Sequence, residues 1–188
     1  MTEVLRPGDG FIFMKVGTHA QEPLGDIIAR KRREIADAGY ALWGYGGNTC
    51  HPFRVQPFAQ DYVRRAGAIY LCMQPMTSRH FAAPVRAAEQ SVDGIHWQEI
   101  PRAVNVVGSR FALAITDLEE TDFVLPLDQT QVAVGAQVGR PGDEYLTGHV
   151  DKACLVLTEP HESTAGAGPV LDIGLVARLG EPYAVLLR

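Results

Sequence analysis

The sequence has no long apolar run and little cysteine. None of its apolar stretches approaches the roughly 18 residues that a transmembrane helix needs. The first ten residues have neither the basic head nor the apolar stretch of a secretory signal peptide. The three cysteines, Cys50, Cys72 and Cys154, are odd in number and show no CxxC spacing, which argues against a disulfide framework. We therefore expect a cytoplasmic protein with reduced thiols and no membrane partner.

The sequence also lacks an excess of positive charge. Its formal net charge is −5, whereas proteins that bind duplex nucleic acid need a positive face to displace counterions from phosphates. Duplex nucleic acid is therefore not an expected partner. A pocket for a single nucleotide or base is compatible with this charge. The abundance of Ala, Gly, Val and Arg is typical of proteins from GC-rich bacterial genomes.

Sequence motifs for common cofactors are missing as well. No GxGxxG stands at a strand–helix junction, no Gly-Lys-Ser/Thr marks a P-loop, and no HExxH marks a zinc protease. The chain therefore identifies no cofactor and predicts no metal site, although a zinc site assembled from distant residues remains an alternative. The histidines are scattered over positions 19, 51, 80, 96, 149 and 161.

Helices are expected near the front of the chain. Pro23 opens a helix at a first-turn position where its missing N–H costs nothing, and Gly39 stands where a C-cap glycine is expected. Within this helix the basic run 30–33 alternates with acidic residues at i,i+4 spacing, which favours a solvated, salt-bridged face. A second helix is expected at 57–66. Strands are expected at 11–16, 41–45 and 68–73.

The rest of the chain is mostly strand-like. Asp93-Gly94 indicates a hairpin turn within 85–100, and the acidic cluster 117–122 is interpreted as a solvated hairpin loop. Short strands separated by turn residues indicate an α+β protein. We predict a single domain, 1–188, built on one strongly bent, mostly antiparallel sheet or partial barrel with two helices from the N-terminal half. The further expected strands are 102–107, 110–116, 123–127, 131–134, 153–158, 170–176 and 183–187.

The segment 39–52, GYALWGYGGNTCHP, is the strongest candidate for a site, and we call it the glycine–aromatic segment. Trp43 and Tyr45 offer flat faces on which a ring can stack, and the backbone N–H groups at Gly46 and Gly47 are suited to an acceptor or anion. The amide of Asn48 both donates and accepts hydrogen bonds. This composition predicts a ligand pocket.

Other parts of the chain are expected to complete the pocket. Lys15 and His19, on and just after the first strand, supply charge if that strand lies beside the segment. The glycine-rich stretch 135–148 leads into His149, Asp151 and Lys152, and Arg140 within it is a further candidate ligand residue. A small planar or anionic molecule, best a nucleotide or nucleobase, is the predicted ligand.

Three alternatives remain open at this stage. Trp43 and Tyr45 also fit as core residues of a strand followed by a tight turn. Cys50, with His51 beside it, makes a Cys-dependent hydrolase or transferase conceivable, with His19, His80, His96 or His149 as the better-placed base because adjacent side chains point apart. The segment also suits a subunit interface in an oligomeric scaffold, for which a homodimer is the simplest assembly.

Overall fold

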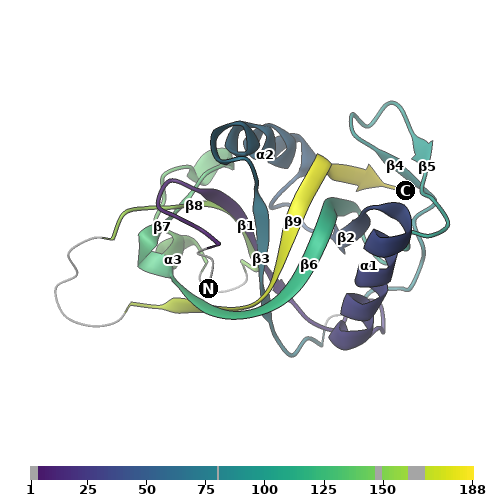
Figure 1. The fold of residues 1–188 in the computed structure, drawn as a ribbon, viewed down its shortest axis with the longest axis horizontal. Helices are drawn as coiled ribbons and strands as arrows, with labels where there is room; N and C mark the ends of the chain where they lie inside the picture. The colour runs from purple at the N-terminus through teal and green to yellow at the C-terminus, as the bar shows by residue number, and fades with distance from the viewer. Residues whose placement is uncertain (1–3, 80, 147–149, 161–167) are drawn as a thin grey trace.

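The computed structural model describes residues 4–79, 81–146, 150–160 and 168–188. Within them the chain forms one mixed sheet of nine strands, with three α-helices and two short 3-10 helices (Figure 1). The strands are β1 Gly10–Val16, β2 Ala41–Tyr45, β3 Tyr70–Pro75, β4 Glu89–Ser91, β5 Gln98–Glu99, β6 Phe111–Pro126, β7 Thr130–Val132, β8 Lys152–Leu157 and β9 Val170–Leu187. The helices are α1 Leu24–Ala38, α2 Pro52–Ala66, η1 Leu127–Gln129, η2 Gly135–Gln137 and α3 Gly142–Tyr145.

The sheet runs in the order β2-β6-β9-β3-β1-β8-β7, and the small β4–β5 hairpin joins it through β9. Its pairs are antiparallel except for β1 with β3, which run parallel within the described residues. The sheet does not close into a barrel, because β2 and β7 are its two ends. The α+β class is therefore confirmed, and the third helix, α3, is an addition to the two that were predicted.

The two long helices pack on one face of the sheet. Ile27 and Ile28 of α1 and Val55 and Phe58 of α2 join the largest apolar cluster, which also contains Trp43. Both helices end where the sequence predicts, because Gly39 and Gly67 take left-handed C-cap conformations that favour glycine. The opposite face is covered by separate clusters, one of them formed by the 85–107 stretch against β2 and β6.

Three predictions of secondary structure were wrong. The second helix begins at Pro52, five residues before the predicted start, because His51 caps it and Pro57 is tolerated inside. The acidic residues 117–122 lie within the continuous strand β6, which pairs with β9 through several bulges. The stretch 102–107 is not a strand. Its backbone is held in an irregular conformation by Arg86, which donates hydrogen bonds to the carbonyls of Ile100, Pro101 and Val104.

Candidate functional site

The main cavity, of about 770 Å³, lies where β1, β2 and β3 bring their ends together. Because β1 and β3 are parallel, with Val16 opposite Pro75, the segments that follow them leave the sheet on the same side. The N–H of Met76 donates to the carbonyl of Val16 at 2.7 Å. Gly17 is needed at this crossing, since an added Cβ would lie 2.5 Å from the Met76 carbonyl oxygen. Helix α1, the 106–109 connection and the start of β8 complete the wall.

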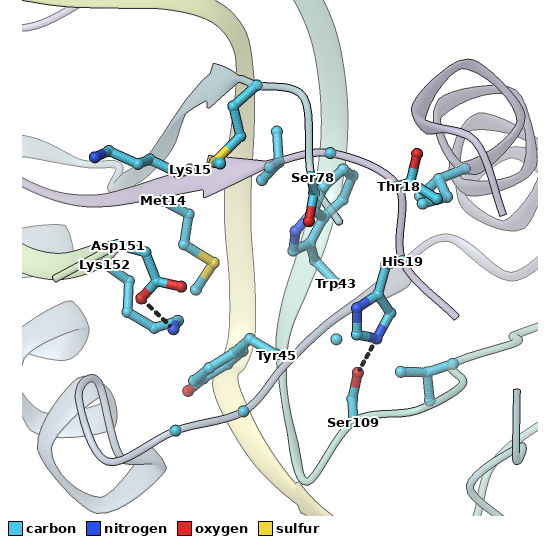
Figure 2. A pocket seen from close by; sticks show the side chains of 18 of the residues that line it. Met14, Lys15, Thr18, His19, Trp43, Tyr45, Ser78, Ser109, Asp151 and Lys152 are labelled. Atoms are coloured by element: carbon cyan, nitrogen blue, oxygen red, sulfur yellow. Dashed lines mark hydrogen bonds and ion pairs between the residues drawn. The ribbon is translucent and has the colours of Figure 1, made fainter. Parts of the chain in front are cut away.

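The floor of the main cavity is apolar. Met14, Trp43 and Tyr45 line it and belong to the same apolar cluster, and Figure 2 shows them around the middle of the cavity. Trp43 is only 6% exposed and belongs to the largest core cluster. The tryptophan is thus both a core residue and part of the cavity wall, so the two interpretations of this side chain are compatible.

One polar end of the main cavity is formed by β8 and the glycine–aromatic segment. Lys152 Nζ pairs with Asp151 Oδ1 at 2.6 Å. Gly47, with φ +87°, lies beside this lysine, since a Cβ built there would be 3.6 Å from Nζ. Asn48 is exposed at the same end. An ammonium, a glycine backbone and a side-chain amide therefore border the cavity at this end.

The other polar end is formed by His19 and Ser109. His19 Nε2 lies 3.2 Å from the Val107 carbonyl oxygen and 3.3 Å from Ser109 Oγ, which itself donates to Val107 at 3.0 Å. Because a carbonyl only accepts, Nε2 carries the proton and donates. In this arrangement His19 does not act as a base toward Ser109. The pair offers a hydroxyl and an imidazole for hydrogen bonding to a ligand.

A charged group that the sequence did not reveal adjoins this end, and we call it the α1 charge network (Glu22, Arg30, Lys31, Glu34 and the backbone of Asn105). Arg30 pairs with Glu22 and with Glu34, the latter at 2.8 Å, and Lys31 pairs with Glu34 at 2.9 Å. Lys31 is 2% exposed. Burial lowers the pKa of Lys31 from its ordinary value to about 8, and the Glu34 carboxylate opposes that shift.

This network corrects the interpretation of the basic run 30–33 as a solvated face. Lys31 and Glu34 are buried and Arg30 is largely covered, because the polar side of α1 packs against the connection that contains Asn105. The i,i+4 pair of Arg30 with Glu34 does form. Arg32 reaches outward to an exposed ion pair with Glu120.

The sequence-predicted ligand residues fall into two groups. Those that border the main cavity are Lys15, His19, Trp43, Tyr45, Gly46, Gly47, Asn48 and Lys152. Lys15 does so only at the end of β1, where strand alternation puts its side chain on the face opposite Met14, and Figure 2 shows it running away from Tyr45. Arg140 lies apart from the cavity, exposed beside α3, where its guanidinium is 3.7 Å from Glu144.

Cys50 and His51 do not line the main cavity, and their side chains contact different partners. Cys50 is buried, with its sulfur 3.9 Å from that of Cys154. His51 Nδ1 accepts the N–H of Phe53, and its ring packs against Phe53 and Phe111. The position of His51 is therefore that of a helix N-cap. His80 and His149, considered as alternative bases, lie outside the described residues.

Sequence reasoning missed several residues of the cavity wall, among them Met14, Met76 and Ser109. The available signal was the order strand–helix–strand–helix–strand over the first 75 residues, which is typical of parallel neighbours whose carboxyl ends share an edge. Ser109 has no such signal, because it reaches the cavity only through the pairing of β6 with β2.

Comparison with protein-family models, with curated proteins and with solved structures gives no match for this chain. Among the described residues, no three His, Cys, Asp or Glu side chains are grouped closely enough to hold a metal ion. None of the helices in the described ranges is long and apolar enough to cross a membrane.

Proposed function

We propose that the main cavity binds a small planar molecule that carries an anionic group, best a nucleotide or a nucleobase-like compound. The observation that carries this proposal is the order of groups across one cavity, in which Trp43 lies between the Lys152 rim and the His19–Ser109 pair. Its volume of about 770 Å³ falls within the ~300–1,000 Å³ usual for small-molecule sites.

Each part of the cavity wall supports one feature of such a ligand. The indole of Trp43 and the sulfur of Met14 provide an apolar, polarisable surface for an aromatic ring. Lys152 provides the positive charge for a phosphate or carboxylate. When the ligand binds, this contact replaces the ion pair of Lys152 with the exposed Asp151. Lys152 is only 9% exposed, and Gly47 lies beside its ammonium without a side chain of its own, since an added Cβ would be 3.6 Å from Nζ.

The free edge of β2 provides hydrogen-bonding groups for a base. Tyr45 turns its carbonyl toward β6, where it accepts from the N–H of Arg110. Backbone groups of successive residues in a strand point to opposite edges, so Gly44, next to Tyr45, directs its N–H and C=O away from β6. No further strand pairs with β2 in the described part of the chain, and Gly44 lines the cavity. A planar ring beside Trp43 would meet one donor and one acceptor there.

The test uses the two tryptophans of the chain as separate reporters. Trp97→Phe leaves Trp43 as the only indole, and Trp43→Phe leaves Trp97, which stacks under Arg188 at 4.2 Å in the β4–β5 hairpin. Nucleobases, nucleosides and nucleoside 5′-monophosphates are titrated while tryptophan emission is recorded. We expect a saturable change in the Trp97→Phe protein and none in the Trp43→Phe protein.

Charge recognition is tested with a matched pair of variants. Lys152→Met should weaken binding of a monophosphate about tenfold, equivalent to loss of one charge-assisted contact, and should leave the nucleoside unaffected. Arg140→Met removes an equal charge from an exposed position outside the cavity and should change neither. A flat titration for every compound, together with no co-purifying mass in native mass spectrometry, would refute the proposal.

A further inference from the structure

A small cavity of about 150 Å³ adjoins the main one, and two of the three cysteines meet in its wall. Cys50 belongs to the connection between β2 and α2, and Cys154 belongs to β8. The thiol of Cys154 donates to the sulfur of Cys50 over 3.9 Å. Asn48 and Thr49 line both cavities. A chemical change at the cysteine pair therefore occurs within two residues of the proposed ligand site.

We propose that Cys50 and Cys154 form an oxidation site, at which a peroxide converts the two thiols into a reversible disulfide that ties the connection after β2 to β8. The disulfide bond length is about 2.05 Å, so the sulfurs must approach by about 1.9 Å from their present separation. Cys154 is held in a strand that pairs with β1 and β7. Cys50 lies outside the regular elements, so the connection supplies the movement.

The reaction balances with the peroxide as the only oxidant. The Cys50 thiolate attacks one peroxide oxygen, the O–O bond breaks, and Cys50 becomes a sulfenic acid while the other oxygen leaves as hydroxide and takes up a proton. The sulfur of Cys154 then attacks the sulfenic sulfur, the S–O bond breaks, and the departing hydroxide takes the thiol proton as water. Two thiols lose two electrons in total, and the peroxide is reduced to two waters.

The pKa and the exposure of the two cysteines indicate which one reacts first with the peroxide. The hydrogen bond to Cys50 and complete burial raise the pKa of Cys154 well above its ordinary value, so Cys154 remains a thiol. Both cysteines line the small cavity through which a peroxide arrives, and Cys50 is the more exposed of the pair, at 4% against 1%. Cys50 is therefore the sulfur that reacts first, and Cys154 resolves the sulfenic acid.

The third cysteine provides an internal control. Cys72 lies on β3 with its side chain in the cluster on the opposite face of the sheet, and burial raises its pKa above the ordinary range. Trypsin separates all three cysteines, because cleavage after Arg and Lys yields the peptides 34–54, 66–79 and 153–178. Each possible disulfide thus gives a distinct linked mass.

The experiment treats the full-length protein with one equivalent of hydrogen peroxide and maps its tryptic peptides by mass spectrometry. We expect a link between 34–54 and 153–178, loss of two hydrogens from the intact monomer, and reversal by dithiothreitol. Cys72→Ser should behave like the original protein. In Cys154→Ser, Cys50 should instead accumulate as a sulfenic acid that dimedone traps. Links that involve 66–79, links between chains, or overoxidation without any link would overturn the proposal in the original protein itself.

An effect of the disulfide on ligand binding in the main cavity rests on the proposed function, and it is measured in a separate experiment. Dissociation constants of a nucleoside monophosphate are measured for the reduced and the oxidised protein. We expect them to differ about fivefold or more, which is the lower end of typical coupling between sites, and to coincide in Cys50→Ser. A linked peptide without any nucleotide binding would refute the ligand and leave the oxidation site standing. Nucleotide binding without a linked peptide would refute the oxidation site and leave the ligand standing. A linked peptide with equal dissociation constants for the reduced and oxidised protein would refute the coupling between the two sites.

Discussion

At the scale of single residues, the hydroxyl of Tyr45 holds the glycine–aromatic segment in place. It donates to the Cys50 carbonyl at 2.6 Å, across the turn that contains Gly46 and Gly47. Tyr45 is buried, and burial raises its pKa above the ordinary range. The hydroxyl therefore remains a neutral donor at all working pH values, and the turn depends on it.

Tyr45→Phe tests this contact, because it keeps the ring and removes the donor. The Cys50 carbonyl loses a buried partner, so the free energy of unfolding should fall by about 1 kcal/mol in urea denaturation. Tyr62→Phe is the matched control, since the Tyr62 hydroxyl makes no hydrogen bond within the described residues and the change should be smaller. Equal losses in the two variants would contradict a role for the Tyr45 hydroxyl.

At the scale of elements, β2 lies unusually close to the 106–109 connection. Only glycine fits at position 44, where an added Cβ would lie 2.3 Å from Ser109 Oγ and 2.7 Å from Val106 Cγ2. Gly44→Ala should therefore lower the free energy of unfolding by about 1–3 kcal/mol, the usual cost of overpacking.

Gly46→Ala is the control for β2, because a Cβ there meets no atom within 4 Å and the backbone is not left-handed. Its effect on stability should be below about 1 kcal/mol. Both variants are compared by thermal unfolding at the same pH. If the two substitutions cost the same, the close approach of β2 to Ser109 would be wrong.

Elements were predictable from the sequence where the signal is local. Gly39 predicts the end of α1 because the left-handed C-cap conformation favours glycine. The strand 41–45 is predicted from the side chains within that segment itself. The stretch containing Val104 and Val106 has the alternating pattern of a strand. Its packing and hydrogen-bond partners, however, are far away in the sequence and come close only in the folded chain. The acidic part of β6 was interpreted as a loop because its pairing with β9 has no local signature.

The same difference between local sequence signals and tertiary packing applies to the residues that line the main cavity. Trp43 and the glycines stand together in sequence and border it together. Ser109 and Lys31 reach it from separate elements, so their chemistry depends on tertiary packing that no short pattern encodes.

At the scale of the whole molecule, the α1 charge network joins two regions far apart in the chain. Arg30 and Lys31 both donate to the Asn105 carbonyl, and the Asn105 N–H donates to Glu34. These contacts hold α1 against the connection that walls the cavity. Stability of the fold is thereby linked to the protonation of Lys31.

The pH dependence follows from the lowered pKa of Lys31, which is about 8 in the folded protein against an ordinary 10.5. Below pH 8 both states carry the proton, and the fold bears the full cost of burying the ammonium. Between pH 8 and 10.5 the unfolded chain binds more protons at Lys31, so the contribution of Lys31 to the free energy of unfolding should rise with pH, by on the order of 3 kcal/mol in total.

Urea unfolding of the original protein and Lys31→Met between pH 7.5 and 10 measures this contribution as the difference between two slopes. Lys31→Met removes the titrating group, while Glu34 keeps its contacts with Arg30 at 2.8 Å and the Asn105 N–H at 3.1 Å. The variant should therefore lack this contribution, so its free energy of unfolding should change less favourably with rising pH than that of the original protein. Lys15→Met, which removes a half-exposed ammonium outside the network, should keep this contribution. Parallel curves for the original protein and Lys31→Met would mean that Lys31 is not buried as a charged group, and the network would lose its central member.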